Sequence, residues 1–301
     1  MPRPTFEGHR HASRQVEHNG IKGARSTTGV CSNLRGLPVT HIHVLSRLTL
    51  VGSLAVLGTG SFIGPSLAQP SPDILKATLA QPNEKTAEVS TDELRRMLAE
   101  GSATVFDARP HLEFAISHIP GALNVAPKAG VPMSLYVSDV AEIGRILGDR
   151  KDAAIVLYCN GPFCGKSKRL AEELSGAGYT NVRRYQLGAP VWRALVGVMQ
   201  IEPDGIGYVR EGDKTAVFFD VRSAEEFRAG SINGARHLPK EEVVKAKDDG
   251  RLPMEDHNTR IIVFGKDTAQ ARAAAEEMAK NAFHNVSFYG GSLADLKLAS
   301  N

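Results

Sequence analysis

Cysteine is scarce in this chain. Only Cys31, Cys159 and Cys164 occur among its 301 residues. None of them lies near histidines at a spacing typical of a metal site, and two cysteines without nearby histidine do not hold zinc. We therefore expect no metal ion and no cofactor.

A strong excess of one charge is also absent once the first part of the chain is set aside. The chain carries a net charge of +3, of which residues 1–68 contribute +5, so the remainder carries −2. A nucleic-acid-binding domain needs a basic face. This balance therefore excludes nucleic acid as an expected partner.

Residues 48–68 lack any charged side chain, and Arg47 precedes them. Together with the small residues before Gln69, they show the pattern of a secretory signal peptide. We expect cleavage after Ala68 and a periplasmic or secreted protein. Because no Arg-Arg pair precedes the apolar run, we expect export by the general secretory route. After cleavage we expect no stable membrane insertion; an uncleaved membrane anchor is the alternative.

The stretch upstream of this signal is polar and patternless. No methionine occurs between Met1 and Met97, so a non-Met start near Val44 would explain it, and Cys31 would then be outside the working protein. Residues 69–87 contain Pro, Gln and Ser, and predict a disordered linker.

One pattern of about a hundred residues occurs twice in the rest of the chain. Residues 105–109 match 218–222, and further matches follow at the same offset of 113. Residues 155–158 match 261–264 at an offset of 106, and beyond the loop that follows them the offset falls to 104. The first copy therefore has a loop two residues longer, and Cys159 aligns with Gly265.

Strands and helices alternate within each copy. In the first copy we expect strands at 103–106, 123–125, 154–158 and 181–185, and helices at 91–100, 110–116, 140–147, 168–174 and 190–198. Ser90 with Glu93 predicts a capping box, and Trp192 a core position. The alternation predicts two α/β domains, 88–200 and 201–301, each a parallel sheet with helices on both faces.

The loop after the strand 154–158 reads Cys-Asn-Gly-Pro-Phe-Cys-Gly-Lys-Ser-Lys over residues 159–168. It joins the carboxyl end of a strand to the amino end of a helix, where backbone N–H groups and the helix dipole favour an anion and a thiolate. Candidate catalytic residues are Cys159 and Cys164. Candidate substrate-binding residues are Gly161, Gly165, Lys166, Ser167 and Lys168.

These features together resemble a tandem rhodanese-like protein. The motifs that carry the resemblance are Asp107-Ala108-Arg109, Glu113-Phe114, the segment 118–124, their second occurrence at 220–235, and the cysteine loop. The resemblance implies a sulfurtransferase. A cysteine takes sulfane sulfur from a small donor such as thiosulfate and passes it, as a persulfide, to a thiol acceptor or cyanide.

The chain departs from the family pattern in its loop. Cys159 precedes Ser167 by eight residues, Lys166 stands where the family has Arg, and Cys164 is additional. From its place at the strand end we expect Cys159 to be the nucleophile, with the loop N–H groups converging on its sulfur. Cys164 is a resolving thiol, an alternative nucleophile or a disulfide partner. The second copy has Gly265 at this position and should be catalytically silent.

Asp107, Arg109 and Glu113 are expected to be structural. The carboxylate of Asp107 can accept loop N–H groups, and Arg109 can pair with Glu113 four residues on. The equivalent trio persists in the copy without cysteine, as Asp220, Arg222 and Glu226. We expect His118 and His237 to hydrogen-bond within loops.

Three other functions fit parts of the sequence. A phosphatase or arsenate reductase requires an Arg six residues after the cysteine. This chain has Gly165 at that position, which argues against this function. Thiol–disulfide exchange could use Cys159 and Cys164. A non-catalytic binding module would use the second domain to hold an unidentified protein partner.

Overall fold

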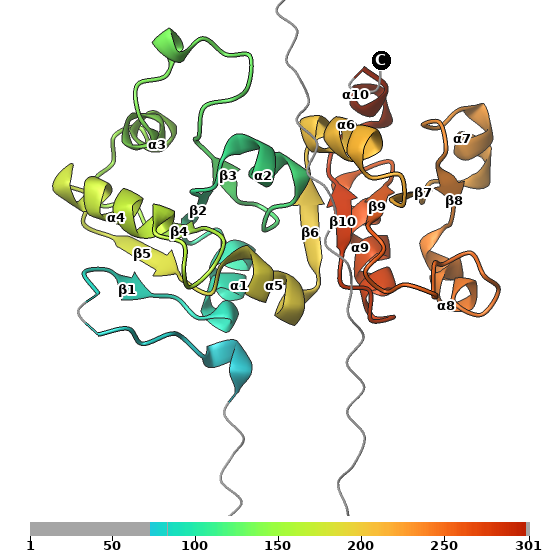
Figure 1. Cartoon of the computed structure of the whole chain (residues 1–301), viewed down its shortest axis with the longest axis horizontal. Helices are drawn as coiled ribbons and strands as arrows, with labels where there is room; N and C mark the ends of the chain where they lie inside the picture. Colours follow the sequence, from blue (N-terminus) through green and yellow to red (C-terminus); the bar gives the residue numbers. More distant parts are fainter. Residues whose placement is uncertain (1–72, 83, 299–301) are drawn as a thin grey trace, which may run out of the picture. The chain divides into compact units, whose positions relative to one another are not determined.

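The computed structural model describes residues 73–82 and 84–298, and within them two five-stranded parallel sheets. Figure 1 shows both sheets with their helices. The predicted fold class, two α/β domains of one design, is confirmed. The first sheet has the order β1 (Ala87–Glu88), β5 (Val182–Tyr185), β4 (Ile155–Tyr158), β2 (Thr104–Asp107) and β3 (Leu123–Asn124).

Helices cover both faces of the first sheet, as the strand and helix alternation predicts. One apolar core joins the sheet to α1 (Thr91–Glu100) and α5 (Gly188–Val196), and contains Trp192. A second core, on the opposite face, joins the sheet to α3 (Asp139–Leu147) and α4 (Lys166–Gly176). A sheet buried on both faces requires continuous apolar strands, and β4 is buried along its whole length. The helices are α1 (Thr91–Glu100), α2 (His111–Ile116), α3 (Asp139–Leu147), α4 (Lys166–Gly176) and α5 (Gly188–Val196), and a 3₁₀ turn, η2 (Met133–Leu135), precedes α3.

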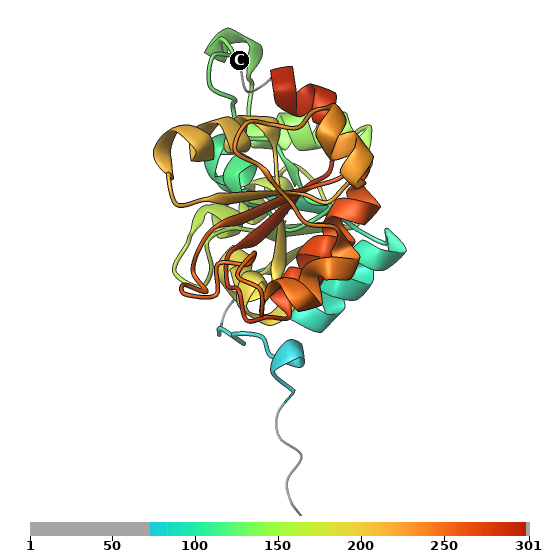
Figure 2. The same cartoon turned by 90° about the vertical axis from the view of Figure 1, so that its right-hand side faces the viewer.

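The second sheet repeats the order of the first. Its strands run β6 (Val198–Ile201), β10 (Val286–Tyr289), β9 (Ile261–Phe264), β7 (Val217–Asp220) and β8 (Arg236–His237). Figure 2 shows these strands between helices on either side. The helices are α6 (Pro203–Gly212), α7 (Ala224–Ala229), α8 (Val243–Ala246), α9 (Thr268–Ala279) and α10 (Leu293–Leu298), with a 3₁₀ turn, η3 (Lys240–Glu242), before α8.

The boundary between the two domains lies earlier than the expected residue 200. Strand β6 pairs in parallel with β10, so residues 198–201 belong to the second sheet. The helix that the sequence extends to 198 ends at Val196, since Gly197 adopts a positive φ of 99°. Helix α4 also begins earlier than expected, at Lys166 instead of residue 168.

Ser90 and Glu93 both take part in capping the first helix. The Ser90 hydroxyl accepts the N–H of Glu93 at 3.2 Å. The Glu93 carboxylate pairs with Arg183 at 2.7 Å, and the hydrogen bonds from Arg183 and from the Ser90 backbone lower the pKa of Glu93. A capping box with both bonds is found in the second domain, between Ser223 and Glu226.

The segment before β1 differs from the disordered linker that its composition predicts. It includes a 3₁₀ turn, η1 (Ile74–Lys76). The Glu88 carboxylate accepts the N–H of Leu79 at 2.7 Å, and Glu84 pairs with Arg184 at 2.8 Å. Long-range ion pairs and side-chain hydrogen bonds thus attach this segment to the first domain.

The predicted signal peptide, residues 1–68, lies outside the described residues. In the part of the chain that the structure describes, no helix is long and apolar enough to cross a membrane.

Candidate active site

The site is built at the carboxyl ends of β2 and β4, which are neighbours in the first sheet. Asp107 ends β2 and pairs in register with Tyr158, which ends β4. Cys159 follows directly and is buried, with 2% of its surface exposed. The strand ends therefore bring the Asp107 motif beside the cysteine loop.

Two glycines let the loop fold tightly. Gly161 has a φ of +105°, which residues with a side chain rarely adopt. A Cβ on Gly188 would lie 2.4 Å from the Gly161 nitrogen and 2.5 Å from the Cys159 carbonyl oxygen. The absence of that atom allows the N–H of Ala189, at the start of α5, to donate to the Cys159 carbonyl at 3.0 Å. No local sequence pattern predicts this close approach of α5.

The thiol of Cys159 lies inside the loop. It donates to the carbonyl oxygen of Cys164 at 3.2 Å and lies 3.4 Å from the hydroxyl of Ser167. Both cysteines are free thiols. Burial raises the pKa of Cys159 above its ordinary value, and hydrogen bonding to the Cys164 side chain acts in the same direction. Cys159 is therefore held as the protonated member of the pair.

Cys164 is partly exposed, and its surroundings favour the thiolate. Partial burial opposes ionisation, but the hydrogen bond from Cys159, the N–H groups of Lys166 and Asn160, and the charge of Lys166 together lower the pKa of Cys164. Ser167 supplies a backbone N–H to Cys159. The expectation that the loop N–H groups converge on Cys159 thus differs from the structure, in which two of them point to Cys164.

The remaining loop residues lie in different settings. Ser167 is buried beside Cys159, while Gly165 is exposed and starts α4 as its N-cap. The ammonium of Lys168 pairs with Glu84 at 3.0 Å. Lys166 is therefore the predicted cation whose charge acts on the cysteines.

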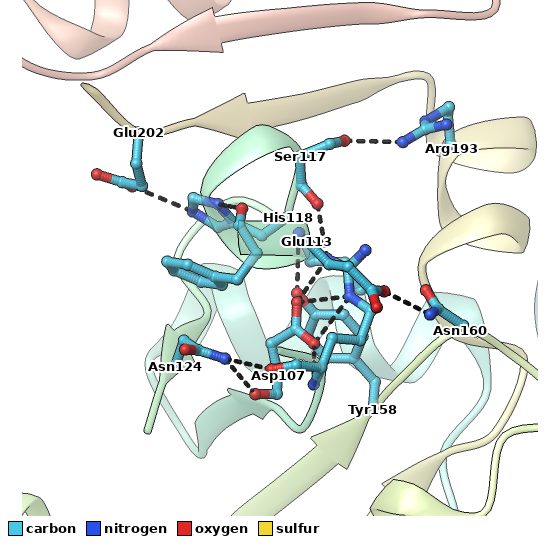
Figure 3. A network of polar contacts seen from close by, with 12 residues as sticks. Asp107, Glu113, Ser117, His118, Asn124, Tyr158, Asn160, Arg193 and Glu202 are labelled. Carbon is cyan, nitrogen blue, oxygen red and sulfur yellow. Dashed lines mark hydrogen bonds and ion pairs between the residues drawn. The ribbon is translucent and has the colours of Figure 1, made fainter. Parts of the chain in front are cut away.

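A buried ion pair between Asp107 and Arg109 lies beside the strand end that leads into the loop. Figure 3 shows Asp107 within this network of polar contacts. The guanidinium of Arg109 donates to the Asp107 carboxylate through Nε at 2.9 Å and through Nη2 at 2.5 Å. The N–H of Arg109 also donates to Asp107 at 2.9 Å, as expected for this motif. The expected pairing of Arg109 with Glu113 is not what the structure shows, because Arg109 Nη2 instead donates to the carbonyl of Ser117 at 2.6 Å.

Glu113 has a different role from the one that the sequence predicts. Its carboxylate accepts a hydrogen bond from the Asn160 side chain at 2.5 Å, across 47 residues of sequence (Figure 3). Asn160 is the residue after Cys159. Glu113 therefore holds the cysteine loop, a contact between distant segments that no local pattern reveals.

The same framework occurs in the second domain. Arg222 Nη2 donates to Asp220 at 2.6 Å and to the carbonyl of Gly230 at 2.9 Å. Glu226, the counterpart of Glu113, caps its own helix. The Asp and Arg of the motif are thus structural in both copies, whereas the contact of the Glu with the loop is specific to the first.

The loop of the second domain holds an amide side chain where the first domain holds the thiol. A Cβ on Gly265 would lie 2.8 Å from the Gln270 side-chain oxygen. That oxygen already accepts the N–H of Lys266 at 2.9 Å. The interior of this loop is therefore occupied by an amide side chain.

Comparison with known proteins agrees with this architecture. The model of the rhodanese-like domain matches residues 90–195 and again residues 209–299. The chain belongs to the rhodanese-like domain family. It is a tandem protein with one rhodanese-like domain that carries cysteines in its loop and one that does not.

Two relatives match part of this rhodanese-like protein. A human thiosulfate:glutathione sulfurtransferase is 35% identical over 101 residues, which is 32% of this chain and 84% of that enzyme. An HTH-type transcriptional regulator of Mycobacterium tuberculosis is 32% identical over 120 residues, 40% of this chain and 47% of the regulator. The chain thus spans about half the length of that regulator.

Solved structures match this chain with low identity and low TM-score. A complex of EanB with hercynine has 18% identity and a TM-score of 0.33, covering 72% of this chain and 61% of that one. A thiosulfate sulfurtransferase from Pseudomonas aeruginosa has 21% identity and a TM-score of 0.32, covering 71% and 43%. Among the described residues, no group of three metal-ligating side chains could hold an ion.

Proposed function

We propose that this protein is a sulfurtransferase that carries sulfane sulfur as a persulfide on Cys159. The observation that carries the proposal is the contrast between its two loops. In the first, a thiol lies at the end of β4 among hydrogen-bonding groups, and in the second, Gly265 and Gln270 fill the same place. The family match and the human relative, whose name pairs thiosulfate with glutathione, support the same chemistry.

The chemistry follows from the contacts around the two thiols. Cys159 attacks the sulfane sulfur of a thiosulfate-like donor, the S–S bond of the donor breaks, and sulfite leaves with its electron pair. The Cys159 proton passes to Cys164, with which it shares a hydrogen bond. The charge of Lys166 stabilises the oxyanion of the donor. Because Cys159 is only 2% exposed, the exposed loop tip at residues 162–163 must move outward to admit the donor.

The test is cyanide-dependent turnover of thiosulfate. Wild-type protein should form thiocyanate, and Cys159→Ser should abolish it. Ser102→Ala, which changes an exposed side chain of the same domain, is the control and should keep full turnover. Undiminished turnover in Cys159→Ser would disprove the role of this residue.

We also propose that the protein is exported, with cleavage after Ala68. The charge-free residues 48–68 support this assignment. Amino-terminal sequencing of native protein should begin at or near Gln69. A native protein that retains residues 1–68 in the cytoplasm would contradict it.

A further inference from the structure

The loop holds a second thiol that a one-cysteine sulfur transfer does not need. Cys164 lies five residues after Cys159, and the turn between them is closed by its N–H, which donates to the Gly161 carbonyl at 3.0 Å. The same turn brings the Cys164 carbonyl to 3.2 Å from the Cys159 sulfur. The side chains of the two cysteines are also hydrogen-bonded to one another across this turn.

We propose that Cys164 is a resolving thiol that releases the sulfur as hydrosulfide and leaves a Cys159–Cys164 disulfide. This inference rests on the proposed function, because it begins from a persulfide on Cys159. It adds a second activity to the site, the reductive release of sulfide, and it names the co-substrate as a dithiol reductant.

The step balances in atoms and electrons. The Cys164 sulfur attacks the inner sulfur of the Cys159 persulfide, a Cys159–Cys164 S–S bond forms, and the bond to the outer sulfur breaks. The outer sulfur leaves with the electron pair and the thiol proton as HS⁻. The two cysteines are oxidised and the sulfane sulfur is reduced. A dithiol then reduces the loop by two successive thiol–disulfide exchanges and leaves as its own disulfide, which returns both cysteines to thiols.

Burial decides which nucleophile can reach the inner sulfur. Cys159 is 2% exposed, and its sulfur is covered by the Cys164 carbonyl and the Ser167 hydroxyl. An external thiol meets the outer sulfur first, whereas Cys164 already contacts the inner one. The lowered pKa of Cys164 adds to this geometry, since the thiolate is the attacking form.

The surface at Cys164 is open to a reductant. Cys164 is partly exposed, and the side chain of Phe163 beside it is fully exposed. Once the disulfide has formed, its Cys164 sulfur is on the solvent side of the pair. The dithiol therefore attacks at Cys164 and leaves Cys159 as the first thiol to be released.

The experiment is a single turnover of the full chain with thiosulfate and no reductant. Sulfite, hydrosulfide and the mass of the loop peptide are measured in wild type, Cys159→Ser, Cys164→Ser and the exposed control Ser102→Ala. In wild type and control we expect sulfite, one equivalent of hydrosulfide and a loop peptide lighter by two hydrogen atoms. Cys164→Ser should release sulfite but no hydrosulfide, and its loop should gain one sulfur atom.

Other outcomes overturn the proposal in distinguishable ways. Sulfite without hydrosulfide in wild type, with a stable persulfide as in Cys164→Ser, leaves the sulfurtransferase in place and refutes the resolving role. A persulfide on Cys164 in Cys159→Ser reverses the order of the two cysteines. No sulfite from any protein refutes the proposed function, and this inference with it.

Discussion

His118 should make the first domain sensitive to acid. Its side chain is 1% exposed, its Nδ1 lies 3.0 Å from the Phe114 carbonyl oxygen, and its ring stacks on Phe114 with centroids 3.9 Å apart. As expected from the sequence, it forms hydrogen bonds within its own segment. Burial lowers the pKa of His118 from 6.5 to about 4, and Glu202, 3.5 Å away, does not restore it.

The size and sign of the effect follow from linkage. Because the folded pKa of His118 lies below the unfolded value, its stabilising contribution is complete above pH 6.5 and is lost as the pH falls towards 4. At about 1.4 kcal/mol per pKa unit, the shift corresponds to about 3 kcal/mol in all, and about 2 kcal/mol is lost by pH 5.

Trp192 provides the assay, because it is the only tryptophan of the chain and lies buried in the first domain. Its fluorescence should report urea unfolding of that domain at pH 8 and at pH 5. His118→Gln removes the titrating group and keeps an amide donor for Phe114, so its loss of stability between these pH values should be about 2 kcal/mol smaller than in wild type. The exposed His284→Gln serves as control and should behave as wild type. An equal loss in His118→Gln would refute the reasoning.

Three further outcomes follow from the framework around the loop. Asp107→Asn breaks a fully buried ion pair and should lower the free energy of unfolding of the first domain by about 3–5 kcal/mol, as followed by tryptophan fluorescence. Asp220→Asn, its matched counterpart, should leave that transition and thiosulfate turnover unchanged. Glu113→Gln weakens the hydrogen bond from Asn160 and should raise the KM for thiosulfate about fivefold, equivalent to ~1 kcal/mol. The free energy of unfolding should change little. An unchanged KM would show that this bond does not position the loop. Residues 198–301 expressed alone should melt cooperatively and turn over no thiosulfate, and turnover by that fragment would contradict the assignment of a silent domain.

Local pattern was enough to establish the fold class. The repeat, the alternation of strands and helices, and the cysteine loop at the end of a buried strand are all properties of contiguous residues. Strands buried on both faces must be apolar throughout, so β4 and β9 could be recognised from composition alone. The absence of a cysteine at Gly265 was likewise sufficient to predict that the two domains differ in chemistry.

Contacts between distant residues were decided only by the tertiary structure. The Arg109 guanidinium donates to Asp107 and to the Ser117 carbonyl, and it does not pair with Glu113. A buried guanidinium is most stable where its N–H groups have the most hydrogen-bond acceptors. Glu113 was thereby left to hold Asn160.

The path of the loop main chain was also outside the reach of sequence patterns. Whether an N–H group points to Cys159 or to Cys164 depends on backbone angles within a turn, and those angles are set by the close approach of α5 at Gly188. The sequence alone determined which residues make up the site. Which cysteine receives the loop N–H groups depended on packing against α5, a helix that begins more than twenty residues later.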